Sequence, residues 1–364
     1  MRIGVLGGGQ LGRMLALAGH PLGLSFVFID PAPGAPMAPL ARAITADYSD
    51  HAALDALAYA ADVVTWEFEN VSAEPLSRLI AAGKPVRPGP KSLEHKQDRW
   101  NEKLFFQKLG LPGAAGATAV TRPAFDAALA ALGMPAVIKT RRHGYDGKGQ
   151  ARVNTPRDAD EAWKALGSEP LLVEKFIPFD RELSIVATRS ATGEIRCWPL
   201  VENVHKEGIL RISRAPAPRI TPQLTLEAET YMRRVLEALE HVGTLALELF
   251  QVGSRLLVNE MAPRVHNSGH WTIEGAVTSQ FENHLRAIAG LPLGDTRARG
   301  HSVMINLIGS TPPPAAMLDV PGAHLHLYGK AAQPRRKLGH VTVTGQDEGA
   351  VLAAAERVKA LVRE

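Results

Sequence analysis

Two glutamates that interrupt or end apolar strands are the first candidates for chemistry. Glu248 lies inside the apolar run 245–250, and Glu260 ends the run 256–260. If the turn between them holds an odd number of residues, both side chains lie on one face of a hairpin, because side chains alternate with period two. Neighbouring carboxylates repel each other unless one is protonated or a cation lies between them. Such oxygen ligands suit Mg²⁺, with Asn259 as a further neutral oxygen. The alternative is a solvated Glu248.

A glycine-rich loop follows another strand. Lys139 ends the apolar strand 136–139, and the segment Gly144–Gly149 then places three glycines in six residues. Its backbone amides and the charge of Lys148 suit a flap over nucleotide phosphates. It is not a Walker A loop, which has Lys-Ser/Thr directly after its last glycine. The alternative is a solvated hairpin tip, which Lys139 disfavours because a lysine at a buried strand end requires an anion.

The segment 264–272, RVHNSGHWT, follows the second glutamate directly and is dense in polar groups. Arg264 can make bidentate contacts to phosphate or bicarbonate. Asn267, Ser268 and His270 can hydrogen-bond a substrate. A single histidine is more often structural than catalytic, but two beside arginine and asparagine after a metal strand favour a functional role.

The N-terminal glycines Gly7–Gly12 match the pattern G-x-G-x-x-G between a strand and a helix, and Asp30 ends the next strand. Alone, this pattern indicates an NAD-dependent dehydrogenase. The same physics serves any anion at a helix N-terminus, and a tight turn without a ligand is a further alternative. The later motifs disfavour the dehydrogenase, which has no use for them.

Further polar residues follow the strand 63–66. Glu67 and Asn70 are expected near the carboxyl edge of the sheet, where open α/β sheets bind ligands. The alternative is a polar helix start, with Glu69 and Asn70 favoured by the helix dipole.

The elements that position these residues are predicted from periodicity. In residues 1–95, strands and helices alternate, which predicts a parallel α/β sheet. The predicted strands are 2–6, 25–30 and 63–66, and the predicted helices are 10–18, 52–60 and 73–82. The Pro- and Gly-rich stretch 84–90 could end this domain.

Residues 96–295 mix strands and helices and predict an α+β unit. Its predicted helices are 99–109, 226–242 with Thr225 at the N-cap, and 279–289; its predicted strands are 136–139, 171–176, 182–188, 197–201 and the hairpin 245–250 with 256–260. Residues 296–364 predict a small C-terminal domain. Its strands are 302–308, 324–327 and 340–344, followed by the helix 348–363.

The composition narrows the class of protein. Hydrophobic residues make up 45% and charged residues 21%, as in ordinary globular proteins. A net charge of +4 with only 5% aromatic residues favours a small anionic substrate over nucleic acid. The single cysteine, Cys197, excludes an internal disulfide and favours the cytoplasm. Neither a membrane span nor a signal peptide is predicted, because no apolar run approaches ~20 residues.

Taken together, these motifs resemble the ATP-grasp superfamily and, within it, the family of N5-carboxyaminoimidazole ribonucleotide synthetases. The matching segments are 7–13, 66–70, 139 with 144–149, 174–177, 248, 259–260, 264–272, 302–306, 328–330 and 336–340. They extend over nearly the whole chain in the expected order, and 264–272 is the most specific. Arg335 is a departure, because the family more often has glycine there.

The resemblance implies an ATP-grasp fold behind an N-terminal Rossmann-like domain, two Mg²⁺ ions and ATP as co-substrate. It also implies that ATP phosphorylates bicarbonate to carboxyphosphate. The amine of 5-aminoimidazole ribonucleotide then captures the carboxyl group, or CO₂ released from it. Family members are commonly homodimers, and neither nucleic acid nor a membrane is an expected partner.

The resemblance also assigns residues. Those expected at the ATP site are Arg99, Lys139, Gly144, Tyr145, Asp146, Gly147, Lys148, Gly149, Glu174, Lys175, Phe176, Ile177, Glu182, His205, Asn259 and Glu260. Those expected to bind the ribonucleotide are Gln10, Leu11, Glu67, Asn70, Asn267, Ser268, Lys330 and Arg336. Lys148, Arg264 and His270 are expected to act on the reacting groups, and Glu248 and Glu260 to bind metal.

Three alternatives remain open at this stage. One is another ATP-grasp ligase, such as a biotin carboxylase or a formate-using glycinamide ribonucleotide transformylase, which the segment 264–272 and the pair Lys330 and Arg336 disfavour. The second is the NAD-dependent dehydrogenase. The third is a non-catalytic nucleotide-binding protein, which the intact acidic pair disfavours.

Overall fold

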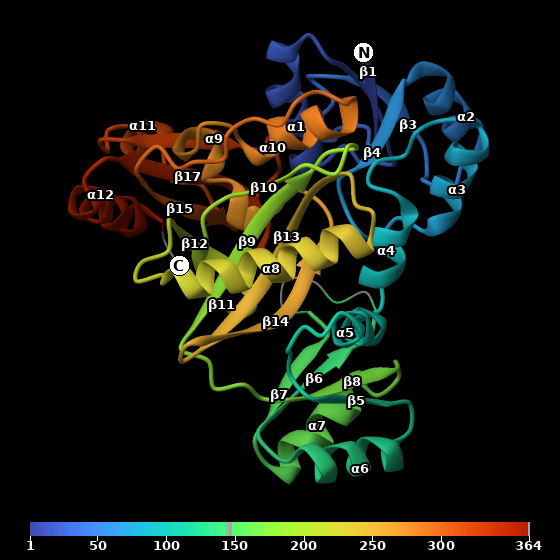
Figure 1. Ribbon diagram of the computed structural model, residues 1–364, viewed down its shortest axis with the longest axis vertical. Helices are drawn as coiled ribbons and strands as arrows, with labels where there is room; N and C mark the ends of the chain where they lie inside the picture. Colours follow the sequence, from blue (N-terminus) through green and yellow to red (C-terminus); the bar gives the residue numbers. More distant parts are fainter. Residues whose placement is uncertain (143, 145–147, 363–364) are drawn as a thin grey trace.

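The N-terminal sheet is parallel, with the order β3-β2-β1-β4, as the strand–helix alternation predicts. The computed structural model describes residues 1–142, 144 and 148–362 (Figure 1). The elements of this unit are β1 (Arg2–Leu6), α1 (Gln10–Gly19), η1 (His20–Leu22), β2 (Ser25–Asp30), β3 (Arg42–Thr45), α2 (His51–Ala60), β4 (Val63–Trp66) and α3 (Ala73–Ala81). The sequence analysis missed β3, because this largely exposed edge strand has no apolar alternation.

Two helices connect this sheet to the rest of the chain. α4 (Pro90–Lys96) was not predicted and begins at Pro90, a residue favoured in a first helical turn. α5 (Arg99–Lys108) follows, and the Asp98 side chain caps it by accepting from the N–H of Trp100 at 2.9 Å. These helices place Lys96 and Arg99 beside the central sheet.

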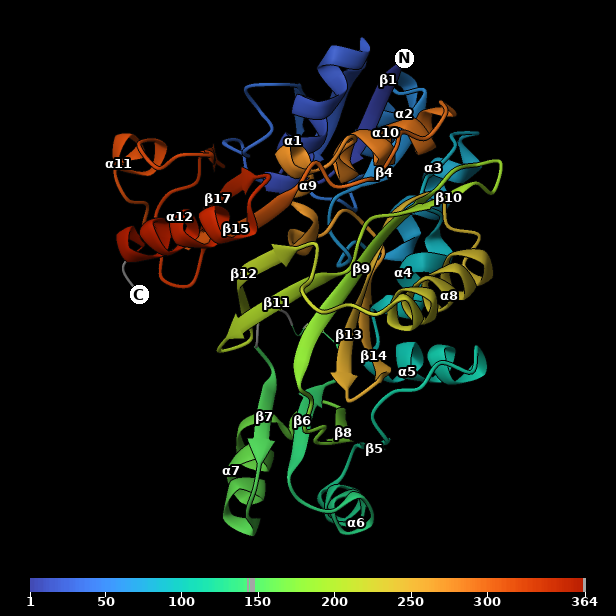
Figure 2. The same ribbon diagram turned by 60° about the vertical axis from the view of Figure 1, so that its left-hand side comes forward.

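A four-stranded antiparallel sheet with the order β5-β8-β6-β7 forms the end of the molecule opposite the N-terminal sheet (Figures 1 and 2). Its elements are β5 (Gly116–Ala119), α6 (Arg122–Leu132), β6 (Ala136–Thr140), β7 (Gln150–Val153), α7 (Pro156–Leu166) and β8 (Leu171–Lys175). Both helices pack on one face, where Phe125 and Ile138 are buried. The glycine-rich segment lies between β6 and β7 in the chain, and only Gly144, Lys148 and Gly149 of it are described.

The central sheet has nine strands, with the order β14-β13-β9-β11-β12-β15-β17-β16 and β10 paired to β9. Its first part consists of β9 (Arg181–Arg189), β10 (Ile195–Cys197), β11 (Val201–Lys206), β12 (Ile209–Ala215), β13 (Gly243–Val252) and β14 (Arg255–Ala262). The predicted strand 197–201 was wrong, because this segment is the connection between β10 and β11. Trp198 in that connection is buried, which explains why the segment looked like part of a core strand.

α8 (Pro222–Ala238) packs on one face of the central sheet through Leu224, Met232 and Leu236. The prediction of Thr225 as its N-cap was wrong. Thr221 caps the helix, with its side chain accepting from the N–H of Leu224 at 3.2 Å. The signal was Pro222 directly after Thr221, since proline favours the first helical position.

The last third of the chain extends this same sheet. β15 (His301–Ile308) pairs with β12 and with β17 (Lys337–Gly345), and β16 (Ala323–Leu327) pairs with β17. α11 (Pro314–Leu318) and α12 (Glu348–Leu361) cover its apolar face. The sheet is therefore continuous across residue 296, and the predicted domain boundaries remain predictions.

η2 (Asn267–Gly269), α9 (Thr272–Gly275) and α10 (Gln280–Ala289) connect β14 to β15. α10 joins the N-terminal sheet to the central sheet. Phe281 and Leu285 pack into the same core as α1. On α10, the buried His284 imidazole contacts the Thr65 hydroxyl at 3.0 Å and accepts from the N–H of Thr244 at 3.1 Å.

A second buried histidine joins α4 to the central unit, because His241 contacts the Ser92 hydroxyl at 2.9 Å. Burial lowers the pKa of His241 to about 4 and that of His284 to about 3. Both imidazoles are therefore neutral near pH 7.

Arg335 has a φ of 64°, in the left-handed region that favours glycine. This explains why glycine suits the position in the family that the sequence resembles. The Arg335 guanidinium pairs with Glu207 at 3.0 Å, in the turn between β11 and β12. Within the described part of the chain, no helix is long and apolar enough to cross a membrane.

Candidate active site

Glu248 and Glu260 lie directly opposite each other on β13 and β14. The two strands run from Gly243 to Val252 and from Arg255 to Ala262, so the turn is shorter than the predicted 251–255. Both side chains lie on the same face of the sheet, and 18% and 30% of their surfaces are exposed. The predicted convergence of the two carboxylates is confirmed.

A β-bulge shapes the site beside this pair. Glu248 faces Glu260 but Leu249 faces Val258, so Asn259 is the extra residue on β14. In a regular strand, Asn259 would point to the opposite face from Glu260. The bulge interrupts this alternation, and Asn259 lines the cavity that adjoins α5 and β8.

Each carboxylate has its own cationic or hydrogen-bonding partner. Glu260 accepts from Lys96 Nζ at 2.8 Å and from Arg99 Nη1 at 3.3 Å. Burial alone would raise its pKa, but the charges of Lys96 and Arg99 outweigh burial and hold the pKa well below its usual value. Glu248 lies 3.2 Å from His266 Nε2, and this contact likewise outweighs burial and lowers the Glu248 pKa. Both carboxylates are therefore ionised near pH 7.

This donor set fits a nucleotide-bound Mg²⁺. Two ionised, partly exposed carboxylates converge on one face of the sheet, and Asn259 adjoins Glu260 in the chain. Among the residues that the structure describes, no three His, Cys, Asp or Glu side chains are grouped as a metal site. The protein thus offers few ligands of its own, which suits a cation that retains water and phosphate oxygens.

A cavity of about 290 Å³ lies between α5, β8 and β14. Arg99, Lys103, Lys139 and Glu174 contribute its charged wall, and Phe106, Leu111, Leu172 and Val258 contribute apolar surface. Lys103 and Lys139 each lie 2.6 Å from the Glu174 carboxylate. Although burial opposes them, these two cations lower the Glu174 pKa to about 2. The anion that Lys139 was expected to require is therefore supplied within the protein.

The glycine-rich loop reaches this region through Gly144, whose carbonyl accepts from Arg99 Nη2 at 3.1 Å. Lys148 is exposed. A Cβ at Gly149 would lie 2.4 Å from Thr140 Oγ1, and its φ of 69° also favours glycine. Tyr145, Asp146 and Gly147, which were expected at the ATP site, lie outside the described residues.

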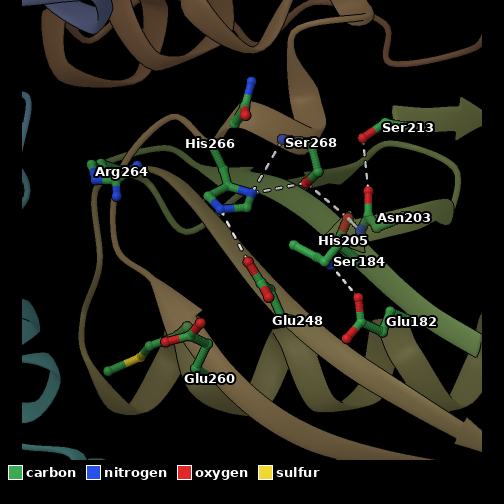
Figure 3. A network of polar contacts seen from close by, with 12 residues as sticks. Glu182, Ser184, Asn203, His205, Ser213, Glu248, Glu260, Arg264, His266 and Ser268 are labelled. Atoms are coloured by element: carbon green, nitrogen blue, oxygen red, sulfur yellow. Dashed lines mark hydrogen bonds and ion pairs between the residues drawn. The ribbon is translucent and has the colours of Figure 1, made fainter. Parts of the chain in front are cut away.

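The segment after β8 leads from the four-stranded sheet to the central sheet. Lys175 is exposed, whereas Phe176 and Ile177 are half-buried. The Arg152 guanidinium lies 4.0 Å from the centre of the Phe176 ring. Farther along, Glu182 on β9 is hydrogen-bonded to His205 on β11, and this contact outweighs burial and raises the His205 pKa. Glu182 and His205 are thus brought together on the face that carries Glu248 (Figure 3).

A chain of hydrogen bonds fixes His266 beside Glu248 (Figure 3). His266 Nδ1 contacts the Ser268 hydroxyl at 2.9 Å, and the Ser184 hydroxyl donates to Ser268 at 2.8 Å. Asn203 donates to Ser184 at 2.9 Å and accepts from Ser213 at 2.8 Å. Ser268 is therefore a fully buried link in this network, which does not support the expected contact with substrate.

Arg264 joins this region to the N-terminal unit. Its guanidinium holds both oxygens of Glu69, one of them at 2.9 Å. Burial would raise the Glu69 pKa, but Arg264 outweighs it and lowers the pKa to about 2. The Glu69 carboxylate thus binds Arg264 in the bidentate manner that was expected of a substrate anion.

The N-terminal glycine loop binds carboxylates of its own chain. Glu67 accepts from the N–H groups of Gly9 at 2.5 Å and Gly12 at 2.7 Å, at the start of α1. Asp30 accepts from Gly8 at 2.8 Å. A Cβ at Gly9 would lie 2.3 Å from the Glu67 carboxylate, so glycine is required for this approach. The position that a dinucleotide phosphate would take is filled, which contradicts the dehydrogenase alternative.

The residues expected to bind the ribonucleotide divide into two groups. Lys330 donates to the Gln10 side chain, which brings the C-terminal third to the start of α1. Arg336 lies in the same connection as Lys330 and donates to the carbonyl of Ala331 at 3.3 Å, and Asn70 is exposed. The structure thus brings Lys330 and Gln10 together, while the approach of Arg336 and Asn70 to them remains a prediction.

The other group is engaged internally. Leu11 packs in the N-terminal core, and the Asn267 amide exchanges hydrogen bonds with Asn306 at 2.7 and 3.0 Å. The Glu67 carboxylate accepts hydrogen bonds from the N–H groups of Gly9 and Gly12. For these three side chains, the expected contact with substrate does not fit their positions.

His270 does not fit the expected catalytic role either. It is fully buried, contacts Gln280 at 3.1 Å, and lies 5.0 Å from the His340 ring centre. Burial holds the pKa of both histidines well below the usual value. This position favours the structural alternative, and a catalytic role of His270 stays an untested prediction.

Sequence reasoning missed Lys96, Lys103 and His266 as individual site residues. Lys96 and Lys103 lie on α4 and α5, and nothing local shows that these helices cross the ends of β14 and β8. His266 was only part of a polar run. A weak signal existed, because buried carboxylates such as Glu174 and Glu260 require cations from elsewhere in the chain.

Comparisons with known proteins agree with this geometry. Residues 1–97 match the ribonucleotide synthetase preATP-grasp domain, residues 104–281 the ATP-grasp domain, and residues 302–354 the phosphoribosylaminoimidazole carboxylase C-terminal domain. The N5-carboxyaminoimidazole ribonucleotide synthase of Pseudomonas aeruginosa is 51% identical over 362 residues, which cover 100% of this chain and 99% of that protein.

Solved structures show the same likeness. N5-carboxyaminoimidazole ribonucleotide synthetase from Thermus thermophilus superposes with a TM-score of 0.95 at 53% identity, covering 100% of this chain and 99% of that one. The Aspergillus clavatus N5-carboxyaminoimidazole synthase, in complex with ADP and 5-aminoimidazole ribonucleotide, gives a TM-score of 0.91 at 32% identity, covering 99% and 98%.

Proposed function

The chain belongs to the family of N5-carboxyaminoimidazole ribonucleotide synthases, and we propose on that premise which of its residues carry the reaction. It is an ATP-dependent carbon–nitrogen ligase of purine biosynthesis. It forms N5-carboxyaminoimidazole ribonucleotide from 5-aminoimidazole ribonucleotide and bicarbonate. The observation that carries the residue assignment is the ionised Glu248–Glu260 pair beside a cavity lined with lysine and arginine.

The chemical problem is that bicarbonate is a poor electrophile. Transfer of the γ-phosphoryl group of ATP to a bicarbonate oxygen gives carboxyphosphate and ADP. The exocyclic amine of the ribonucleotide then attacks the carboxyl carbon, either in carboxyphosphate or in CO₂ released from it. The C–O bond to phosphate breaks, inorganic phosphate leaves, and the amine loses a proton. Carboxyphosphate hydrolyses readily, so the glycine-rich loop has a purpose if it excludes water.

ATP is assigned to the cleft between the four-stranded and central sheets. The segment Glu174–Ile177 offers backbone groups to adenine, while Glu182 and His205 face the ribose. Lys139, Lys148 and Arg99 meet the phosphates, and the fixed positions of Lys139 and Arg99 support this role. In the bound state, ATP phosphates compete with Glu174 for Lys139 and with Glu260 for Arg99.

Glu248 and Glu260, with Asn259 beside them, would hold two Mg²⁺ ions. When bound, Mg²⁺ neutralises charge on the transferring phosphoryl group. His266 and its hydrogen-bond chain orient Glu248, and Lys96 and Arg99 orient Glu260. The convergence of the pair and its low pKa values support this assignment.

The ribonucleotide is assigned to the junction of the N-terminal unit with the last third of the chain. Gln10, Lys330 and Arg336 meet its phosphate, and Arg264 meets bicarbonate or the carboxyl group being transferred. The contacts of Lys330 with Gln10 and of Arg264 with Glu69 support this placement, because each joins the N-terminal unit to a later part of the chain. A homodimer and a cytoplasmic location remain predictions, the first testable by light scattering.

The reaction is tested by measuring ADP release. We expect release that requires ATP and Mg²⁺ and that is stimulated by 5-aminoimidazole ribonucleotide together with bicarbonate. The ionised acidic pair gives the physical reason for the Mg²⁺ requirement. ADP release that does not depend on the ribonucleotide would remove the substrate assignment.

Substitution of Lys330 by Gln tests the phosphate site. We expect KM for the ribonucleotide to rise roughly tenfold to hundredfold, the loss expected for one hydrogen bond to a charged group. KM for ATP should stay unchanged, because Lys330 lies at the N-terminal unit. The matched control is Lys359→Gln, on the exposed face of α12, where Lys359 pairs with Glu356. A parallel rise in both KM values would contradict the assignment.

A further inference from the structure

Lys96 lies between two carboxylates at the end of α4. Its ammonium group is 2.8 Å from Glu260 Oε2 and 3.3 Å from Glu102 Oε1. Only 10% of the Lys96 side chain and 4% of the Glu102 side chain are exposed. A lysine this buried is stable only while it has an anionic partner. Lys96 has two such partners within reach of one terminal atom.

Glu102 keeps its place independently of Lys96. Its Oε1 atom also accepts from the N–H of Met261 at 2.8 Å, the residue directly after Glu260. α5 and β14 are thus joined at this point. Glu102 can therefore receive the whole of the Lys96 charge without moving.

Glu260 has a second cation on the same oxygen. Arg99 Nη1 lies 3.3 Å from Oε2, and Arg99 Nη2 donates to the carbonyl of Gly144 in the glycine-rich loop. In this state, Lys96 and Arg99 are shared between the Glu260 carboxylate and the Glu102 carboxyl group. A divalent cation at Glu260 would add positive charge beside two cations that already hold it.

We propose that Lys96 is a built-in counter-ion for Glu260, and that it passes to Glu102 when a nucleotide-bound divalent cation takes Glu260. The inference rests on the proposed function, because it takes Glu260 as a metal ligand. The change requires only that Lys96 tighten its existing contact with Glu102. No carboxylate is left buried without a partner in either state.

The same arrangement makes metal binding depend on the nucleotide. A bare divalent cation must displace both Lys96 and Arg99 from Glu260. Lys96 then keeps a second carboxyl partner in Glu102, whereas the other contact of Arg99 is with the uncharged carbonyl of Gly144. When phosphates arrive with the metal, they supply the anion for Arg99. Lys96 is thus a positioning residue that disfavours metal without nucleotide.

The test measures the affinity of Mn²⁺, used as a spectroscopic substitute for Mg²⁺, by electron paramagnetic resonance in the presence of saturating ADP. In Lys96→Met, we expect binding to be roughly tenfold tighter, a factor that corresponds to about 1.4 kcal/mol. The matched control is Lys91→Met on the same helix, where Lys91 pairs at the surface with Glu240. Unchanged or weaker binding in Lys96→Met would overturn the proposal.

A second variant has the opposite expected sign. Glu102→Gln keeps an acceptor for the Met261 N–H but removes the charge that receives Lys96, so Mn²⁺ should bind more weakly by a similar factor. Because Glu102 acts only through Lys96, this effect should disappear in the double variant. Full persistence of the Glu102→Gln effect in the Lys96→Met background would refute the transfer. If the unaltered protein binds no Mn²⁺ with ADP, the proposed metal assignment fails instead.

Discussion

The variant Glu260→Gln is expected to lose turnover by roughly a thousandfold or more while it remains folded. The reason is that the amide cannot supply the negative charge that a divalent cation requires opposite Glu248. Loss of one preorganised electrostatic contact costs roughly a hundredfold to a thousandfold in kcat, and a lost metal ligand falls at or beyond the upper end. The measurement is ADP release at saturating ATP, bicarbonate and ribonucleotide.

The fold of this variant should survive, because the amide oxygen of the introduced glutamine would still accept hydrogen bonds from Lys96 and Arg99. Circular dichroism and thermal unfolding check this. Glu240→Gln is the matched control, since 80% of that side chain is exposed, next to Lys91. Near-normal kcat in Glu260→Gln would remove the metal-ligand role.

A steep loss of stability on acidification between pH 6.5 and 4.5 is the second large effect that we expect. Four buried histidines, His241, His270, His284 and His340, have pKa values far below 6.5 because burial disfavours their charged forms. In the unfolded chain they take up protons as the pH falls through about 6.5, whereas in the folded protein they do not. The unfolded state therefore binds more protons, and the free energy of unfolding decreases as the pH is lowered.

Two carboxyls oppose this effect throughout the range. His205, whose pKa is also raised, opposes it only near pH 6.5, because at lower pH its imidazole is protonated in the unfolded chain as well. Burial raises the pKa of Glu102 to about 7 and also raises that of Glu67, so the folded protein takes up protons on these groups before the unfolded chain does. Four histidines against two carboxyls leave a net uptake of about two protons on unfolding. At about 1.4 kcal/mol per proton and pH unit, the free energy of unfolding should fall by roughly 3 kcal/mol per pH unit.

The measurement is urea denaturation at half-unit steps from pH 7.5 to 4.5. In His284→Asn, the side-chain oxygen can take the place of Nδ1 as acceptor for the Thr244 N–H, so the slope should fall by about one proton. His51→Asn, at an exposed position, is the matched control. Stability that is constant across this range would contradict the account.

The sequence predicts most of the elements because their signals are local. The strands 2–6, 25–30 and 63–66 match the structure residue for residue, since each is a short apolar run between turn residues. Proline and threonine positions also locate α8 once Pro222 is read as its first residue. α4 was not predicted because it is short and begins within a Pro- and Gly-rich stretch. α6 and α7 were also not predicted, although each has eleven residues and begins at a threonine N-cap with proline in the first turn, which is a local signal.

Only part of the candidate site can be predicted from the sequence. The turn between β13 and β14 holds two residues, so alternation along a regular hairpin would place Glu248 opposite Asn259 and Glu260 on the other face. The bulge at Asn259 restores the convergence of the two glutamates, and it does not follow from the sequence, because it depends on how β14 pairs with β13. Nor does the approach of Glu67 to α1, since this contact is set by the packing of one strand end against another element. The ion pairs of Lys96 and Lys103 are tertiary for the same reason.

The continuity of the central sheet has a consequence for how the chain is made. β12 pairs with β15, which leaves the ribosome much later, so the earlier part of the sheet is synthesised with an open edge. Unpaired edges invite association between chains. The nascent polypeptide therefore exposes an unpaired strand edge until its final third emerges from the ribosome. We expect a molecular chaperone to bind at that stage.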